Sequence, residues 1–306
     1  MTARAFFYGS GGRLRTPWQW VGFLVVLFAS VLVLSLVGLV VARPATSIQQ
    51  QTVAFWSLLV GGWFAHLVML RWVDGRPWSF VGLARVQAAP WRLGIGLLVG
   101  SLAILAPSGV LLLTKWLMAE PGAAAAGGGV AGSWWRYAAV MAIFFLPQSL
   151  GEELLSRGYL FATAREAMGW RGALVLTSVI FGLLHLRNPG ADLRSIVLVI
   201  LAGGFLGGIL LVTESLYAAW MAHFAWNWSM AAVLHTAVSG LPVTAPGYRV
   251  IDSGPDWATG GAWGPEGGVG AALGMIVGLW VIVSWRRRRA LASNDFERVE
   301  TWRNDA

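Results

Sequence analysis

The chain has 306 residues, is 57% hydrophobic and only 12% charged, contains no cysteine and carries a formal net charge of +8. A soluble domain carries about 25% charged residues, so this composition excludes an ordinary soluble protein, and the lack of cysteine excludes disulfides, thiolate metal sites and a cysteine nucleophile. The positive charge does not indicate nucleic-acid binding, because arginines beside apolar segments are ordinary topology signals of membrane proteins.

The apolar residues lie in long blocks, each near the roughly 20 residues that a helix needs to cross a bilayer. We therefore predict an all-α fold, a polytopic transmembrane helical bundle of about eight spans. In chain order, the expected spans are residues 18–42, 52–72, 93–115, 134–156, 171–187, 194–213, 215–236 and 264–285. The first apolar core is too long for a signal peptide and no cleavage site follows it, so we interpret it as a span.

The basic residues are unequally shared between the two sides of the predicted bundle. With the N-terminus inside, the cytoplasmic segments carry 15 Lys and Arg residues and the outer segments carry 6, with Arg157 left out as part of a motif. This bias predicts that both termini are cytoplasmic. Lys115 is the single lysine, a compositional habit of GC-rich bacterial genomes, so we expect an integral protein of a bacterial plasma membrane.

We expect three parts along the chain: residues 1–133 with the first three helices, 134–236 as a catalytic helical core, and 237–306 with an external loop, the last helix and a basic cytoplasmic tail. Two segments rich in Gly, Ala, Pro or Thr, 121–133 and about 237–262, are predicted to be loose and external. Four glycines in the sixth span form small-xxx-small pairs that are expected to hold the seventh span near the fourth. They are Gly203, Gly204, Gly207 and Gly208.

Two adjacent glutamates, Glu152 and Glu153, lie inside an apolar span, whereas the other acidic residues lie in loops, tails or span ends. A charge at the centre of a membrane helix costs at least about 2.5–3.5 kcal/mol, so such residues indicate function. Neighbouring helical residues point about 100° apart. Glu153 can pair with Arg157 four residues later, whereas Glu152 has only Gln148 and Ser156 on its face, and an unpaired carboxylate in apolar surroundings suits a general base. The alternative is an ion pair that locks the helix beside a spectator glutamate.

A histidine of the fifth span is predicted to lie level with the first glutamate. Gly169 lies in an expected tight turn, and Glu152 and His185 are 17 and 16 residues from it. In an antiparallel helical hairpin these residues share one depth, provided that the fourth helix continues past Arg157 and brings it near the cytoplasmic rim. Phe181 lies on the same face as His185, one turn earlier.

The seventh span carries His223 and Asn227, which are four residues apart and share a face. We expect them to converge with Glu152 and His185 on a pocket open to the cytoplasm. The two remaining histidines match no motif and are expected to serve helix packing or the membrane interface: His66 and His235.

Three motifs follow one another in successive predicted spans. Residues 152–157 fit E-E-x-x-x-R, residues 181–185 fit F-x-x-x-H and residues 223–227 fit H-x-x-x-N. This ordered set resembles the CPBP family of intramembrane proteases, which includes the type II CAAX prenyl endopeptidases and the bacterial bacteriocin-processing and Abi-type proteins. The resemblance covers residues 134–236, about a third of the chain.

The resemblance implies endoproteolysis of a membrane-associated or prenylated protein or peptide. The expected partners are this substrate and the lipid bilayer, and no nucleic acid is expected. Glu152 with His185 would deprotonate a water, and His223 with Asn227 would stabilise the oxyanion. The supporting residues would be Glu153, Arg157 and Phe181.

A metal is left open by the same resemblance. The family is usually described as metalloproteases, and Glu152, His185 and His223 could ligate Zn²⁺. No H-E-x-x-H motif occurs, however, and a glutamate that activates water beside an oxyanion hole needs no ion. We therefore expect no tightly bound metal, with Zn²⁺ as the alternative.

Two other functions fit a membrane protein with buried acids and histidines. A proton-coupled transporter uses such residues as a relay, but it is expected to show repeated halves with broken helices, and no second Glu-Glu segment occurs. A catalytically inert member of the family would act as a scaffold or immunity protein, which the complete set of motifs disfavours.

Overall fold

The computed structural model describes residues 6–9, 12–121, 134–243 and 247–292. The described part is an all-α bundle, as predicted, with one small two-stranded sheet. The long helices are α2 (Thr16–Ala42), α3 (Ser47–Val68), α4 (Pro90–Leu113), α6 (Trp134–Arg157), α7 (Tyr159–Leu184), α8 (Leu193–Thr213), α9 (Leu216–Trp228) and α11 (Val269–Ala292). Shorter elements are η1 (Met69–Val73), η2 (Trp78–Val81), η3 (Arg85–Ala88), β1 (Leu117–Pro121), η4 (Ser229–Leu234), β2 (Tyr248–Asp252), α10 (Asp256–Thr259), η5 (Gly261–Trp263) and η6 (Pro265–Gly267).

The helices agree with the spans expected from hydropathy. Within the described ranges, 6 helical stretches are long and apolar enough to cross a membrane. One of them, Trp134–Leu184, contains the fourth predicted span and most of the fifth. The seventh predicted span is made of α9 and the π-helix η4 that continues it. The prediction of a polytopic helical bundle is therefore confirmed.

Side chains that cap the backbone mark the first residues of several helices. Thr46 accepts a hydrogen bond from the N–H of Gln49, and Asp192 accepts one from the N–H of Ser195, each in a capping box. Hydrogen bonds from the backbone and the hydroxyl of Ser195 hold the pKa of Asp192 below its ordinary value, because they favour the carboxylate. Ser215 caps α9 in the same manner. These caps fix the starting points of α8 and α9 beside the site.

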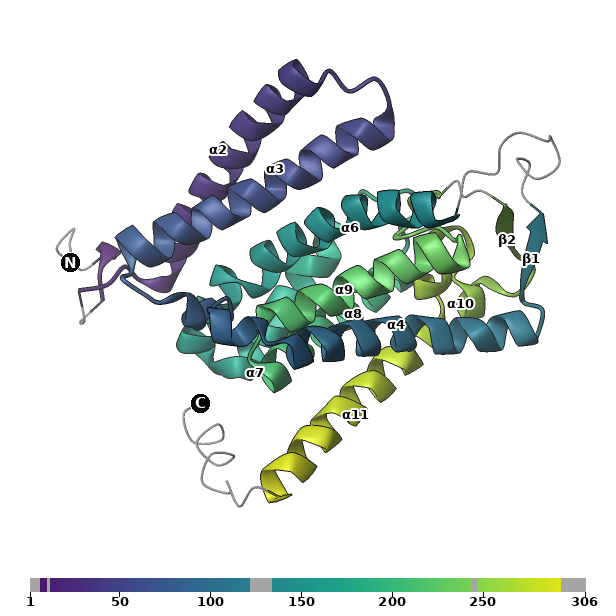
Figure 1. Cartoon of the computed structure of the whole chain (residues 1–306). Helices are drawn as coiled ribbons and strands as arrows, with labels where there is room; N and C mark the ends of the chain where they lie inside the picture. Colours follow the sequence, from purple (N-terminus) through teal and green to yellow (C-terminus); the bar gives the residue numbers. More distant parts are fainter. Residues whose placement is uncertain (1–5, 10–11, 122–133, 244–246, 293–306) are drawn as a thin grey trace.

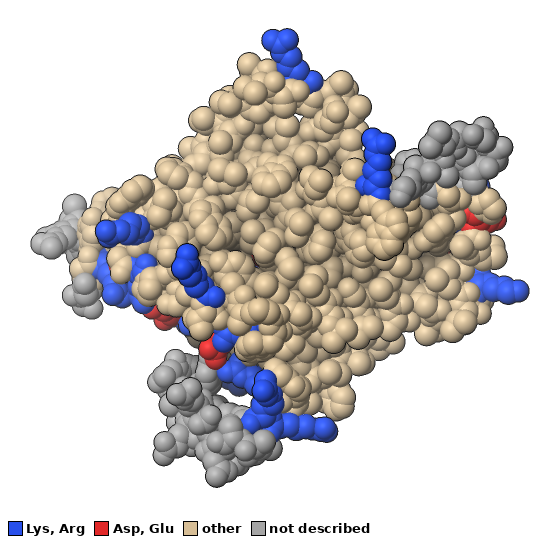
Figure 2. Space-filling model, in the orientation of Figure 1, with Lys and Arg blue, Asp and Glu red and all other residues tan. Residues whose placement is uncertain are grey.

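Figure 1 shows how the helices are arranged. Helices α4, α6, α7, α8 and α9 form a central bundle, the α2–α3 hairpin leans away on one side, and α11 leans away on the other. The start of α2 and the end of α11 lie at one end of the bundle, and the β1–β2 sheet lies at the opposite end. Figure 2 shows most Lys and Arg side chains on this face at the first end, with a broad zone between the two ends that is nearly free of charge. This pattern is that of an integral membrane protein.

Glycines admit the closest helix contacts, and their partners differ from the predicted ones. A Cβ at Gly96 or Gly100 of α4 would lie 2.2 Å from a backbone oxygen of α9, so glycine is required for this approach. The predicted glycine face of α8 instead lies against α7 and α11, with Gly203 beside Ser178 and Gly208 beside Leu279. The expectation that this face holds the seventh span near the fourth was therefore wrong in its partners.

The segment after α9 is not the loose loop that its composition indicated. Strand β2 pairs antiparallel with β1, with Leu117 opposite Asp252. Trp263 is buried against Phe181 and Val199. The composition misled because turn-forming residues here build short helices and a strand that pack on the bundle. The other segment predicted to be loose, 121–133, begins with the last residue of β1, and its remainder lies outside the described residues, as does the tail after residue 292.

Candidate active site

The helix that carries the two glutamates ends at Arg157, and this break differs from the prediction. Gly158 leaves helical geometry with φ −81° and ψ −120°, and α7 begins at Tyr159. The Tyr159 N–H donates to Nε2 of His66 at 3.0 Å, and Nδ1 of His66 lies 2.7 Å from the carbonyl oxygen of Gly62. The fourth helix therefore does not continue past Arg157. The break deprives the Tyr159 N–H of a helical carbonyl acceptor, and His66 of α3 supplies an acceptor in its place.

The expected depth of the histidine is nevertheless confirmed. Gly169 has φ 75° and separates two helical parts of α7, at the turn that was predicted. After it the chain returns to the level of Glu152, whose Oε2 lies 4.0 Å from Nε2 of His185. Arg157 is buried, with only 1% of its surface exposed, and its position near the cytoplasmic rim stays a prediction.

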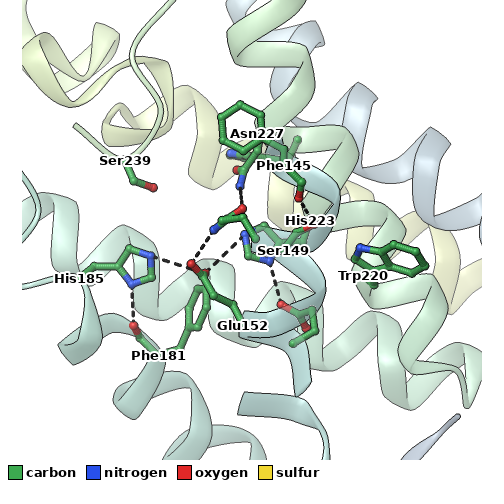
Figure 3. A network of polar contacts seen from close by, with 12 residues as sticks. Phe145, Ser149, Glu152, Phe181, His185, Trp220, His223, Asn227 and Ser239 are labelled. Atoms are coloured by element: carbon green, nitrogen blue, oxygen red, sulfur yellow. Dashed lines mark hydrogen bonds and ion pairs between the residues drawn. The ribbon is translucent and has the colours of Figure 1, made fainter. Parts of the chain in front are cut away.

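Glu152 presents its two carboxylate oxygens to different partners (Figure 3). Gln148 donates to Oε1 from Nε2 at 2.5 Å. The second oxygen, Oε2, faces Nε2 of His223 at 3.8 Å and Nε2 of His185 at 4.0 Å. This Oε2 is buried and has no hydrogen-bond partner within the described residues. Three polar atoms from α6, α7 and α9 therefore converge on one point.

The orientation of both imidazole rings follows from what their other nitrogens contact. Nδ1 of His185 lies 2.8 Å from the carbonyl oxygen of Phe181, and Nδ1 of His223 lies 2.9 Å from Oε1 of Glu153. Both partners are acceptors, so each Nδ1 carries the hydrogen. In the neutral rings, Nε2 therefore directs a lone pair toward Glu152.

Glu153 was predicted to pair with Arg157 only, but it also contacts a histidine of the site. Its Oε1 accepts from Nη1 of Arg157 at 2.9 Å, as the four-residue spacing predicted, and also from His223. The side chains of Glu153 and Arg157 are both 0% exposed. The Arg157 guanidinium lies 4.1 Å from the centre of the Phe181 ring. That ring also contacts His185 and His223, with centroid distances of 4.8 and 5.9 Å.

Asn227 joins the same network through a residue that the sequence motifs do not include. Its Nδ2 donates to Oε1 of Gln148 at 2.9 Å, and Gln148 in turn donates to Glu152. The structure thus brings together every predicted site residue and adds Gln148. The available signal for Gln148 was its position four residues before Glu152, on the same helical face.

Comparison with known proteins agrees with this geometry. Residues 133–229 match the family model described as Rce1-like type II CAAX prenyl endopeptidase. This part of the chain is an Rce1-like domain. It contains all three motifs, so the predicted resemblance to the CPBP family is confirmed for these residues, while α2, α3, α4 and α11 lie outside the match. No curated protein and no solved structure matches the chain.

A metal ion in the Rce1-like domain would need Glu152, His185 and His223. A carboxylate and two imidazoles are donors that Zn²⁺ accepts. Among the described residues, however, no group of three or more His, Cys, Asp or Glu is arranged to hold a metal ion. The expectation that no metal is tightly bound stays a prediction.

A cavity of about 160 Å³ lies against the Rce1-like domain on the far side of the buried ion pair. It is lined by residues of the α3–α4 connection, α7 and α8, including Gln87 and Arg165, together with Arg157 at the end of α6 and Glu214 directly after α8. The four predicted catalytic residues do not line it. The cavity thus contacts Arg157 but none of the four predicted catalytic residues. That a pocket around those four residues opens to the cytoplasm stays a prediction.

Proposed function

We propose that the protein is an intramembrane endopeptidase that hydrolyses a peptide bond of a membrane-associated or prenylated protein or peptide. The observation that carries this proposal is the convergence of Oε2 of Glu152 with Nε2 of His185 and Nε2 of His223. The match of residues 133–229 to the type II CAAX prenyl endopeptidases supports it.

The geometry favours a water molecule as the nucleophile. Separations of 3.8 and 4.0 Å are too long for direct hydrogen bonds and suit a bridging water. Such a water would lie within reach of Oε2 of Glu152, which lacks another partner within the described residues. Because Gln148 occupies Oε1, the water meets the free oxygen of the carboxylate. Glu152, aided by His185, takes the proton as the water oxygen attacks the scissile carbonyl carbon.

The developing oxyanion requires donors, and two are in place. Nδ2 of Asn227 has two hydrogens and gives one to Gln148, so the other is available. His223 can donate from Nε2 only when it is protonated, since its Nδ1–H is directed at Glu153. The Glu153 carboxylate stabilises that protonated ring, much as a buried aspartate does in serine proteases. Loss of one oxyanion donor typically costs about 2.7–4 kcal/mol of transition-state stabilisation.

Collapse of the tetrahedral intermediate completes the reaction. The bond between the carbonyl carbon and the amide nitrogen breaks, and the leaving amine takes the proton that Glu152 received from water. A carboxylic acid and an amine result, and transfer of the acid's proton to the amine gives the carboxylate and the ammonium ion. Glu152 is regenerated, so the cycle consumes one water and requires no further reactant.

Cleavage by the reconstituted protein tests this proposal. Wild type, Glu152→Gln and His185→Ala would be incubated in liposomes with prenylated and unprenylated membrane peptides, and the products identified by mass spectrometry. Glu166→Gln is the matched control, because Glu166 is 44% exposed and pairs with Arg76 on the surface. We expect wild type and the control to cleave, and both site variants to lose roughly 100-fold or more of the rate.

Two results would overturn the proposal in different ways. If wild type cleaves neither peptide but moves protons across the liposome membrane in a manner that depends on Glu152, the protein is a transporter. If it does neither, it is an inert member of the family.

A further inference from the structure

A partly buried carboxylate with three hydrogen-bond donors lies outside the Rce1-like match. Glu266 is in η6, directly before α11, and is only partly exposed. Its Oε2 accepts from Nε1 of Trp226 at 2.8 Å, and its Oε1 accepts from the N–H of Ser239 at 2.5 Å and from the Ser239 hydroxyl at 2.8 Å. All three partners are donors, and hydrogen bonds to a carboxylate are stronger than those between neutral groups. Glu266 thus fastens two separate segments at once.

The first of these segments is the helix that carries the oxyanion donors. Trp226 is buried on α9 between His223 and Asn227. Trp226 lies one helical turn after Ala222, whose backbone oxygen packs against Gly100 of α4, and its bond to Glu266 fixes the indole there. Rotation of α9 would break this bond, so Glu266 sets the direction in which His223 and Asn227 point.

The second segment is a tight turn that abuts the other side of the site. Val238 and Leu241 exchange backbone hydrogen bonds of 3.0 and 2.8 Å around Ser239 and Gly240, which have φ of 49° and 77°. Two residues with positive φ make a type I′ turn. Serine is uncommon in this conformation, and the two bonds from Ser239 to Glu266 hold it there. Figure 3 shows Ser239 at the border of the polar network, between His185 and Asn227.

The turn is connected to His185 through the loop that follows α7. The carbonyl oxygen of Ser239 accepts from Nδ2 of Asn188 at 3.0 Å, and the N–H of Asn188 donates to the carbonyl oxygen of His185 at 3.0 Å. Gly240 approaches Pro189 so closely that a Cβ would lie 1.9 Å from the proline oxygen. The loop cannot move without moving the turn.

We infer that Glu266 is a positioning residue that aligns His185 and the His223–Asn227 turn of α9 with Glu152 at the same time. The inference rests on the proposed function, since alignment matters only if these groups act together on a substrate. It assigns to the segment before α11 a part in catalysis that the motifs of the Rce1-like domain do not contain.

The variant Glu266→Gln tests the inference. The amide replaces one acceptor oxygen with an NH₂ group that would face an N–H or O–H donor, while size and shape are kept. Since small misplacements of reacting groups cost up to about 100-fold in rate, we expect kcat to fall roughly 10- to 100-fold with KM changed less than about twofold. Glu120→Gln is the matched control, because Glu120 forms an exposed pair with Arg249 on the sheet.

A second measurement separates this inference from the proposed function. Hydrogen–deuterium exchange of the full chain in detergent needs no substrate, and we expect Glu266→Gln to speed exchange in residues 185–190 and 236–241 while Glu120→Gln leaves it unchanged. Trp226→Phe, which removes one connection, should lower kcat without this change in the loops. An unchanged kcat in Glu266→Gln, or a loss that only follows the fraction of unfolded protein, would overturn the inference, as would unchanged exchange. An inactive wild type with the expected exchange pattern would overturn the proposed function alone.

Discussion

Replacing Arg157 with methionine should destabilise the protein far more than removing a surface charge. Arg157 and Glu153 are both 0% exposed, and Nη1 of Arg157 lies 2.9 Å from Oε1 of Glu153. Removal of the arginine leaves a buried carboxylate whose remaining contact is His223. Breaking a buried ion pair in this manner typically costs about 3–5 kcal/mol. The contact of the guanidinium with Phe181 would be lost as well.

The double variant Glu153→Gln with Arg157→Met distinguishes stability from catalysis. Replacing both charges with uncharged groups of similar size is often neutral for stability, so we expect its free energy of unfolding to lie within about 1 kcal/mol of wild type. Its activity should remain reduced, because glutamine cannot stabilise the protonated His223. Together with Glu153→Gln, these variants form a double-mutant cycle.

Equilibrium unfolding in mixed micelles gives the free energies, and peptide cleavage gives kcat for the same preparations. Arg157→Ala in place of methionine would add a cavity and obscure the electrostatic term. If Arg157→Met is as stable as wild type, the pair does not stabilise α6. If the double variant recovers full activity, the role given to Glu153 in orienting His223 is wrong.

Three further predictions concern other contacts of the site. Gln148→Leu should lower kcat roughly 10-fold or more, because Oε1 of Glu152 loses its donor; Gln148→Glu should be worse, since two carboxylates would face each other, and equal rates for both variants and wild type would exclude the orienting role. Gly100→Leu should displace α9, since even a Cβ would lie 2.2 Å from the oxygen of Ala222; we expect reduced thermal stability and cleavage, and a wild-type melting curve would contradict the close packing. Removal of metal should not abolish cleavage: we expect less than stoichiometric zinc by elemental analysis and activity that survives a chelator, and a loss that added Zn²⁺ reverses would show that the three side chains close around an ion.

Much of the site could be predicted because helical geometry converts spacing into contact. The four-residue interval placed Glu153 against Arg157, and equal distances from Gly169 placed His185 level with Glu152. Both arguments use only periodicity and the turn. Asn227 was predicted to share the site for the same reason, since it is one helical turn after His223.

The rest depended on contacts between residues far apart in the chain. A single glycine within a helical pattern is usually tolerated, so the sequence around Gly158 does not predict a break in the helix. The break depends on a hydrogen bond to His66, which lies 93 residues before Tyr159. Glu266 lies at the end of the last predicted span, and its partners, Trp226 and Ser239, meet it only in the folded chain. The order of the segment after α9 was hidden for the same reason, because its composition is that of a loop.

The acceptor that His66 offers to Tyr159 bears on how self-sufficient the Rce1-like domain is. Residues 133–229 contain every motif, yet the break after the glutamate pair is completed by His66 of α3, α9 packs against α4, and Trp226 of α9 is held from η6. A fragment cut to these boundaries would keep the residues of the three motifs and lose the elements that position them. The segment that carries the motifs is therefore smaller than the set of elements that hold it in place, which extends over nearly the whole length of the chain that the structure describes.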